Sequence, residues 1–304
     1  MNGNMEASTL STRVSLRNKL KKYDKLYKIS SSIFQKYSSL TGFLHVLPDF
    51  YIIGAARSGT TSLYDHLIQH PSVYPTIGKE LHYFEMYYNR SANWYRSCFP
   101  YRLNKFFITK IQSKNFLTGD ATPRYLDNPH IPTRIKQLTP NAKFIVLLRN
   151  PIERAFSHYN MNIKNGYETL SFEKAIELEN DRIKNGYDKM LKNGSYSGDY
   201  FAYAYLERGK YAEKLKKWFQ VFPKKLFVIK NSDDFFTESE RTYNEILQFL
   251  QLSKWKLKKY VPQMVGKYQQ NEIDPKIKKQ LIEYFKPYNE DLYKLLDTNY
   301  HWDD

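Results

Sequence analysis

A turn that begins and ends with glycine, placed between an apolar run and a helix start, is the first segment whose residues suit chemistry. The apolar run ends at Gly54, and the turn continues to Gly59 before the helix start. This order directs free backbone N–H groups and the positive end of a helix at one point, which suits a phosphate group. We therefore expect a phosphate site whose candidate ligands are Arg57, Ser58, Gly59, Thr60, Thr61 and Ser62.

The cations near this turn distinguish it from a nucleotide-hydrolysing loop. Gly54 and Gly59 have the spacing of the first half of a P-loop, but Thr60 stands where that loop carries its lysine, and Arg57 supplies a cation instead. Hydrolysis also needs an acidic residue after another strand to hold Mg²⁺, whereas the apolar run 144–148 is followed by Arg149. We expect a second anionic group there and no metal. The alternative, in which the glycines only form a tight turn, is less favoured.

The segment that follows Arg149 repeats this arrangement. Asn150 can cap a helix that starts at Pro151, a favoured first position. Arg149 and Ser157, two turns into that helix, could hold a phosphate by charge and hydroxyl donation. From these residues alone an alternative stays open, in which Arg149 forms an ordinary salt bridge and Ser157 is a packing residue.

The elements that must position these residues alternate between strands and helices. A short β-rich run occupies 49–53, and the apolar runs at 144–148 and 226–229 are continuous, as is typical of parallel strands covered on both faces. Helical patterns occupy 151–164, 171–184, 211–219, 238–250 and 275–296. The order predicts an α/β, P-loop-like fold with a central parallel sheet flanked by helices on both faces, in which the two anion sites follow neighbouring strands.

Composition limits the partners and the compartment. The 304 residues include 47 Lys and Arg against 31 Asp and Glu, a net charge of +16 that should attract polyanions, anionic lipids or small anionic substrates. Cys98 is the only cysteine, so neither an internal disulfide nor a cysteine metal cluster can form. No apolar run of about 18 residues and no secretory signal is present, so we expect a cytoplasmic protein without a transmembrane segment.

Residues 1–48 differ from the rest of the chain. Seven Lys and Arg crowd positions 13–28, and Leu16, Leu20, Tyr23 and Tyr27 share one helix face. We expect a basic, helical N-terminal extension over 1–48 and a single domain over 49–304. Packing of the extension on that domain is the favoured interpretation, and peripheral contact with an anionic membrane is the alternative.

Taken together, these motifs resemble sulfotransferases that use 3′-phosphoadenosine-5′-phosphosulfate (PAPS). Residues 54–61 resemble their 5′-phosphosulfate loop, and residues 149–157 resemble their 3′-phosphate motif. Residues 79–84, Lys-Glu-Leu-His-Tyr-Phe, and 122–126, Thr-Pro-Arg-Tyr-Leu, are similar to segments of the heparan sulfate type. The tail, with Gly266, Lys267 and Tyr268 and then 274–302, is similar to that group's nucleotide loop and last helix. The resemblance spans about residues 50–302.

The resemblance implies a role for each matching residue. Glu80 would be the base that takes the acceptor's proton, His82 would orient Glu80 or the acceptor, and Arg57 would balance charge on the leaving phosphate. The residues implied to bind PAPS are Arg57, Ser58, Gly59, Thr60, Thr61, Ser62, Arg149, Ser157, Gly266, Lys267 and Tyr268. No metal is implied. From the residues alone, the favoured interpretation of Glu80 is a surface carboxylate paired with Lys79, and a histidine beside aromatic residues, such as His82, is more often a hydrogen-bonded structural residue.

The acceptor implied by the resemblance is a hydroxyl or amine of a glycan. The chain departs from the heparan enzymes at Ala121, where several of them have lysine, and in lacking their paired C-terminal cysteines. An aromatic cluster could stack on adenine or sugar rings, and it consists of Tyr196, Tyr200, Phe201, Tyr203, Tyr205 and Tyr211. Two other functions are less favoured. A P-loop kinase or NTPase is opposed by the missing lysine, and a non-catalytic nucleic-acid-binding protein is opposed by the absence of a recognition motif.

Overall fold

The computed structural model describes residues 33, 35–257 and 273–303. The expected nucleotide residues Gly266, Lys267 and Tyr268, and most of the expected 1–48 extension, lie outside these ranges. The division into an extension and a domain over 49–304 stays a prediction.

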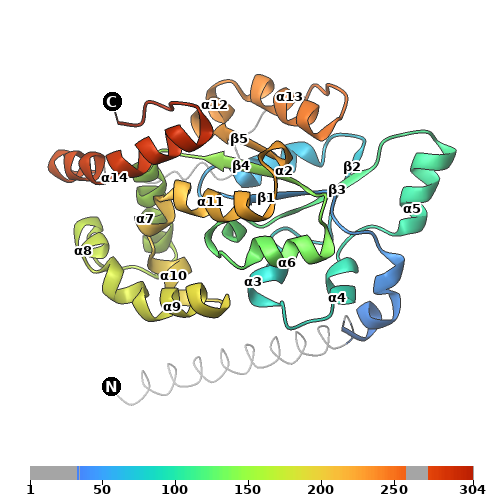
Figure 1. Cartoon of the computed structure of the whole chain (residues 1–304), viewed down its shortest axis with the longest axis horizontal. Coiled ribbons are helices and arrows are strands. Elements are labelled where there is room, and N and C mark those ends of the chain that lie inside the picture. Colours follow the sequence, from blue (N-terminus) through green and yellow to red (C-terminus); the bar gives the residue numbers. More distant parts are fainter. Residues whose placement is uncertain (1–32, 34, 258–272, 304) are drawn as a thin grey trace, which may run out of the picture.

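A five-stranded parallel sheet forms the centre of the molecule (Figure 1). Its spatial order is β2-β3-β1-β4-β5. The strands are β1 (Phe50–Gly54), β2 (Val73–Tyr74), β3 (Leu117–Ala121), β4 (Lys143–Leu148) and β5 (Phe227–Asn231). The three strands expected from the sequence are confirmed as β1, β4 and β5, and β1 and β4 are neighbours as expected, with Ile52 opposite Ile145. The sequence reasoning missed β2 and β3.

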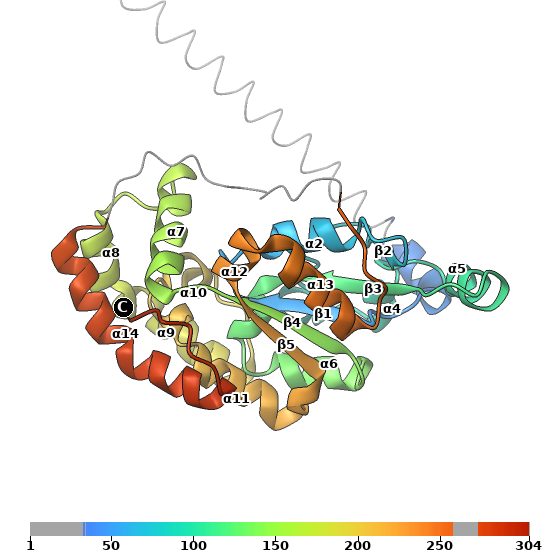
Figure 2. The ribbon, with the colours of Figure 1, turned by 90° about the horizontal axis from the view of Figure 1, so that it is seen from above.

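Helices cover both faces of this sheet, which confirms the expected fold class (Figure 2). Before β4 the chain forms η1 (Gly42–Leu44), α2 (Thr60–Leu67), α3 (Tyr83–Met86), α4 (Ala92–Arg96), α5 (Arg102–Phe106), the π-helix η2 (Phe107–Ile111), η3 (Pro123–Asp127) and α6 (Ile131–Leu138). After β4 it forms α7 (Pro151–Lys164), α8 (Phe172–Glu177), α9 (Glu179–Asn193), α10 (Gly198–Tyr203), η4 (Glu207–Gly209), α11 (Tyr211–Val221), η5 (Lys224–Leu226), α12 (Ser232–Thr237), α13 (Ser239–Leu250) and α14 (Pro275–Leu296).

The helices expected from the sequence form with small changes. The predicted helix over 151–164 is α7, and Asn150 caps it by accepting hydrogen bonds from the N–H groups of Ile152 and Glu153. The predicted helix over 171–184 is wrong in one respect, because the structure has two helices there, α8 and α9, with Leu178 between them. Ser171 caps α8, and α9 continues to Asn193, where Gly194 adopts the left-handed conformation that ends it.

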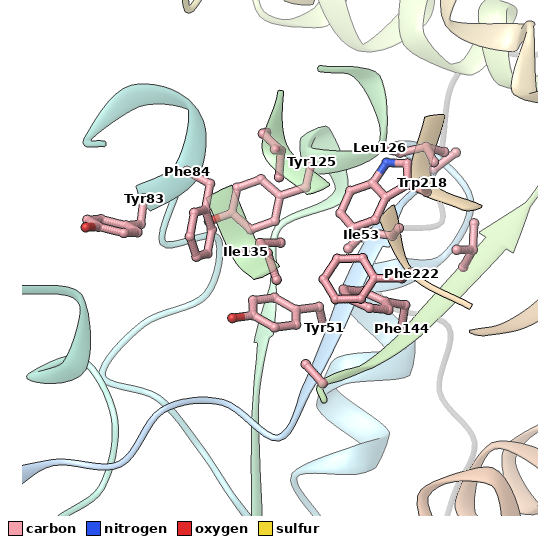
Figure 3. Packing of buried hydrophobic residues seen from close by; sticks show 14 of the residues in the cluster. Tyr51, Ile53, Tyr83, Phe84, Tyr125, Leu126, Ile135, Phe144, Trp218 and Phe222 are labelled. Atoms are coloured by element: carbon pink, nitrogen blue, oxygen red, sulfur yellow. The ribbon is translucent and has the colours of Figure 1, made fainter. Parts of the chain in front are cut away.

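Alternation along the central strands divides the core between the two faces. Phe50 and Ile52 pack against α2 and α13, whereas Tyr51 and Ile53 face the layer that contains α6 and α11. On the second face, the ring of Phe144 lies 5.2 Å from that of Trp218 and 4.6 Å from that of Phe222 (Figure 3). All the named strand residues are fully buried, so the strands are held rigidly beneath the loops at their carboxyl ends.

Strand β3 escaped sequence detection because its centre reads as a turn. Its sequence Leu-Thr-Gly-Asp-Ala places an acidic residue, Asp120, where an apolar one would be expected. The structure satisfies this buried carboxyl with hydroxyl donors: Tyr95 at 2.8 Å, Tyr125 at 3.0 Å and Thr122 at 2.7 Å. Burial raises the pKa of Asp120, while these hydrogen bonds oppose the rise. Tertiary contacts thus override the poor strand propensity.

We predict that Asp120→Ala lowers the free energy of unfolding by about 2–4 kcal/mol, because three buried hydroxyls lose their acceptor. Asp120→Asn, which keeps one acceptor oxygen, should cost less. Urea denaturation measures both, and Asp188→Ala, an exposed aspartate on α9, is the control. A loss below about 0.5 kcal/mol for Asp120→Ala, the size typical of surface substitutions, would contradict this account of β3.

Candidate active site

The turn after β1 has the geometry of an anion-binding loop. Gly59 has φ +85° at the N-cap of α2, and a Cβ there would lie 2.7 Å from Cζ of Phe236, so glycine is required on both grounds. Because Gly59 has no side chain to cap α2, the first N–H groups of this helix are available to a ligand anion. The hydroxyl of Ser58 is buried and has no partner among the described residues. This orphaned donor suits an anion seated in the loop.

Arg57 joins the two predicted anion sites. Its Nε and Nη2 atoms donate to Oγ of Ser157 at 3.2 and 3.1 Å, and its Nη1 lies 3.4 Å from Sδ of Met161. Both partners are on α7, about a hundred residues away in sequence. Arg149, at the end of β4, donates to the carbonyl oxygen of Arg57 at 3.4 Å. The two loops therefore form one site at the carboxyl ends of β1 and β4.

Arg149 itself is only loosely held. Its Nη2 lies 3.5 Å from the half-exposed carboxylate of Glu153, a weak contact of the kind that surface pairs make. Its backbone carbonyl accepts from the hydroxyl of Tyr211 at 2.9 Å. The backbone is thus fixed, while the guanidinium is left partly exposed beside the loop.

Glu80, His82 and Glu85 form a chain of polar contacts beside this site. The backbone N–H of Glu80 donates to the carbonyl of Ala121 at 3.2 Å, which fixes it at the carboxyl end of β3, next to β1. Nε2 of His82 lies 3.4 Å from a carboxylate oxygen of Glu80, and its Nδ1 lies 2.5 Å from Oε1 of the buried Glu85. Glu85 fixes the orientation of the imidazole and leaves Nε2 directed at Glu80.

Backbone conformation singles out the same residues. Arg57 has φ 74°, Glu80 has φ 56° and His82 has φ 52°, all in the left-handed region that non-glycine residues rarely adopt. The remaining described non-glycine residues with positive φ are Ser113, Gln251, Asp297 and His301. Uncommon backbone conformations of this kind concentrate at functional sites, because surrounding structure must hold them in place.

Positive charge accumulates beneath the site. Burial lowers the pKa of His158 well below its usual range, and the charges of Arg208, Arg154, Arg57 and Arg124 lower it further. The fully buried Arg154 donates to the carbonyl of Tyr205, but its Nε and Nη1 have no hydrogen-bond partner among the described residues. Burial lowers its pKa to about 10. The site is therefore a region of positive potential suited to an anionic ligand.

Several expected features are placed elsewhere or were missed. The expected aromatic stacking surface is wrong for Tyr200, Phe201, Tyr205 and Tyr211, which are buried, whereas Tyr196 is exposed. Sequence reasoning passed over Glu85, although its position three residues after His82 is a detectable signal. It also passed over His158 and Arg154, which no local sequence pattern marks.

Fold and site together define an α/β protein with an anion-binding loop at the carboxyl ends of its central strands, and comparison with known proteins supplies the family. Residues 47–291 match the family model described as "Sulfotransferase domain", so the chain belongs to the sulfotransferase family and is a sulfotransferase enzyme. This decides against the kinase and the non-catalytic alternatives.

Particular relatives are similar across most of the chain. Membrane-associated sulfotransferase kil1 of Dictyostelium discoideum is 28% identical, covering 86% of this chain and 68% of that protein. Human heparan sulfate glucosamine 3-O-sulfotransferase 3B1 is 24% identical, covering 84% of this chain and 65% of its own length. A solved sulfotransferase from Alicyclobacillus acidocaldarius matches 85% of this chain and all of that one, with 25% identity and a TM-score of 0.66. The chain thus spans about two thirds of these two curated relatives.

The described ranges contain neither a membrane-spanning helix nor a group of side chains that could bind a metal ion. None of the helices in those ranges combines the length and the apolar composition that a membrane span needs. No group of three His, Cys, Asp or Glu residues there is placed to hold a metal ion. The expectation that no metal takes part stays a prediction.

We predict that His158 makes the folded protein less stable as the pH falls. Because its pKa is lower in the folded chain than in the unfolded one, the unfolded chain binds the proton first below about pH 6.5, so stability decreases there. Between about pH 7 and pH 5 the loss should be on the order of 2 kcal/mol. Urea denaturation of wild type and His158→Gln measures it. Because the lowered pKa of His70 acts in both proteins, only the difference reports on His158. Parallel pH profiles would contradict the assignment.

Proposed function

We propose that this sulfotransferase moves a sulfuryl group from PAPS to a hydroxyl or amine of a glycan, with Glu80 as the base. The observation that carries the proposal is the contact of Arg57 with Ser157, at 3.1 and 3.2 Å, because it joins two anion-binding loops into one site. A donor with phosphate groups at two separated positions suits a site of this form. The expected cytoplasmic location stays a prediction.

The described residues fit such a donor. The N–H groups at the start of α2 and the hydroxyl of Ser58 would hold the 5′-phosphosulfate, with Arg57 alongside. Arg149 and Ser157 would hold the 3′-phosphate by charge and hydroxyl donation. PAPS supplies the activated sulfuryl group. Gly266, Lys267 and Tyr268 are proposed nucleotide ligands on the strength of the sequence resemblance.

The chain's own residues divide the work of transfer. Glu80 would accept the proton from the attacking hydroxyl or amine, since its carboxylate is partly exposed and its backbone is fixed against β3. His82, oriented by Glu85, would position that carboxylate through Nε2. Arg57 would stabilise the charge that develops on the departing phosphate.

A glycan acceptor is supported by relatives and by a group of aromatic and basic side chains around Arg124. The names of several relatives specify heparan sulfate glucosamine as their substrate. Just after β3, Arg124 lies 5.0 Å over the ring of Phe201 and 3.3 Å from the hydroxyl of Tyr196. The rings of Tyr196 and Phe201 stack with centroids 5.4 Å apart. Phe201 is buried, but the exposed ring of Tyr196 beside this cation suits a sugar that carries an anionic group.

If the donor is PAPS, the protein should bind a nucleotide that carries a 3′-phosphate more tightly than one that lacks it. 3′-Phosphoadenosine-5′-phosphate should raise the melting temperature more than AMP does, because only the former reaches Arg149 and Ser157. Arg149→Ala should weaken its binding about tenfold or more, through loss of a charge-assisted contact of roughly 1.5–3 kcal/mol. Isothermal calorimetry gives the affinities, and Arg241→Ala, an exposed arginine on α13, is the control. Equal thermal shifts from the two nucleotides would remove the 3′-phosphate assignment.

If Glu80 is the base, its replacement should lower turnover without weakening nucleotide binding. Glu80→Gln should lower turnover by about 10² to 10⁴ while leaving nucleotide affinity nearly unchanged. Arg57→Ala should reduce both, since the same guanidinium meets the bound donor and the transition state, and Arg57→Lys should keep much of the activity. Transfer of radiolabelled sulfate from PAPS, screened across polysaccharides, lipids, peptides and phenols, measures turnover and identifies the acceptor.

Glu177→Gln provides the matched control, because Glu177 is an exposed carboxylate that pairs with Lys174 on the surface of α8. Wild-type turnover in Glu80→Gln, with Arg57→Ala inactive, would show that His82 or a group on the substrate takes the proton. Failure of every polysaccharide with success of another acceptor class would overturn the glycan proposal and leave the donor assignment intact.

A further inference from the structure

A helical loop projects from the molecule between α4 and β3. Residues 101–115, here called the projecting loop, contain α5 and then η2. The two views place this loop at the end of the molecule opposite α7 (Figure 1, Figure 2). None of the side chains of α5 or η2 is buried.

One face of the projecting loop is apolar although it is open to solvent. Leu103, Phe107 and Ile111 follow at intervals of four residues, the spacing of one helix face, and Phe106 lies beside them. Leu103 is 74% exposed, Ile111 62%, Phe106 54% and Phe107 51%. Large apolar side chains gathered in this way on a surface mark an interaction site rather than ordinary surface scatter.

The charged residues in the segment that carries this face are all basic. Between Glu85 and Asp120 the sequence has no acidic residue and six basic ones: Arg90, Arg96, Arg102, Lys105, Lys110 and Lys114. Lys105 pairs with Asp49 at 2.8 Å, but Lys110 and Lys114 stand exposed on the projecting loop itself. A surface of this kind attracts an anionic partner.

A second segment extends the same surface. His45 pairs with Tyr101 in an isolated antiparallel bridge, and the hydroxyl of Tyr37 lies 2.6 Å from that of Tyr101. Residues 35–48 therefore lie beside the base of the loop. They add the exposed side chains of Leu40 and Phe43 and no acidic residue.

The projecting loop is separated from the candidate active site by the length of the sheet. It leads directly into the first residue of β3, Leu117, whereas Glu80 and Arg57 lie at the carboxyl ends of the strands. A partner bound at the projecting loop would leave the donor and acceptor sites open.

We infer that the projecting loop is a contact site for an anionic membrane surface. Its apolar face would enter the headgroup and upper acyl region, while Lys110, Lys114 and Arg102 would meet lipid phosphates and carboxylates. Long basic side chains reach outward in this way while their methylene stems stay in the apolar layer. The single-sign charge favours lipid over a protein groove, for which mixed charges would be expected at the rim.

The test uses the full-length chain and sedimentation with phosphatidylcholine vesicles that contain or lack phosphatidylserine. Wild type should bind the anionic vesicles and bind the neutral ones much less. Leu103→Ser with Phe107→Ser should weaken binding at least about tenfold, because two exposed apolar side chains no longer enter the lipid. Lys110→Glu with Lys114→Glu should do the same and lower the salt dependence. All four positions are exposed, so the fold should persist.

The matched controls are Leu191→Ser and Lys192→Glu, which change an exposed leucine and a lysine on α9 and should bind as wild type does. Unchanged binding of the loop variants would overturn the inference and assign membrane contact to the basic segment 13–28, whose lysines and arginines lie outside the described residues. Unchanged nucleotide binding in the loop variants separates this result from any failure of the proposed function.

A reporter in the loop tests insertion directly. In Phe107→Trp, brominated lipids in the anionic vesicles should quench more tryptophan fluorescence than they do in wild type. Light scattering of wild type and of Leu103→Ser with Phe107→Ser gives the oligomeric state. A dimer in wild type that the double substitution dissociates, without extra quenching in Phe107→Trp, would show that the surface binds a second copy of the chain instead.

Discussion

Parallel pairing of β1 with β4 is the constraint on which the candidate site depends. Phe50 lies opposite Lys143 and Ile52 opposite Ile145, so the loops that follow the two strands begin at the same edge of the sheet. This is what allows Arg57 to reach Ser157 on α7. A shift of one residue in either strand would exchange its two buried faces, and the double-sided core prevents it.

That rigid support holds in place several site residues whose backbone conformation or burial is energetically unfavourable. Arg57, Glu80 and His82 hold left-handed backbone conformations, and Arg154 is buried with two nitrogens that lack partners among the described residues. Neither feature stabilises the folded chain, so surrounding contacts must offset their cost. The core on both faces of the sheet, which includes the aromatic cluster of Phe144, Trp218 and Phe222, holds the strands that carry the loops (Figure 3).

The sheet also separates two kinds of surface. Its carboxyl edge carries the strained loops, arginines and partly exposed carboxylate of the candidate site. The opposite end carries the projecting loop, where Leu103 and Phe107 are exposed beside lysines. Because all five strands run in one direction, residues at one edge are held at a distance from those at the other. Substitutions in the projecting loop should therefore leave the geometry of the candidate active site unchanged.

The sequence by itself determined the elements whose signals are local. Continuous apolar runs predicted β1, β4 and β5, Asn150 and Pro151 predicted the start of α7, and the glycines at 54 and 59 predicted the loop after β1. Motifs matched residue by residue indicated the sulfotransferase family, which the match over residues 47–291 shows. Each of these depends on neighbours along the chain, which a sequence displays directly.

Only the tertiary structure decided the features that depend on distant partners. Asp120 lies in a strand because Tyr95 and Tyr125 donate to its carboxyl, and nothing local indicates those donors. Tyr205 is buried rather than available for stacking, and the pKa of His158 is lowered by its burial and by the charges of arginines from four segments. Burial and electrostatic environment are properties of three-dimensional proximity, so the residue types and their spacing could nominate site residues but could not supply their surroundings.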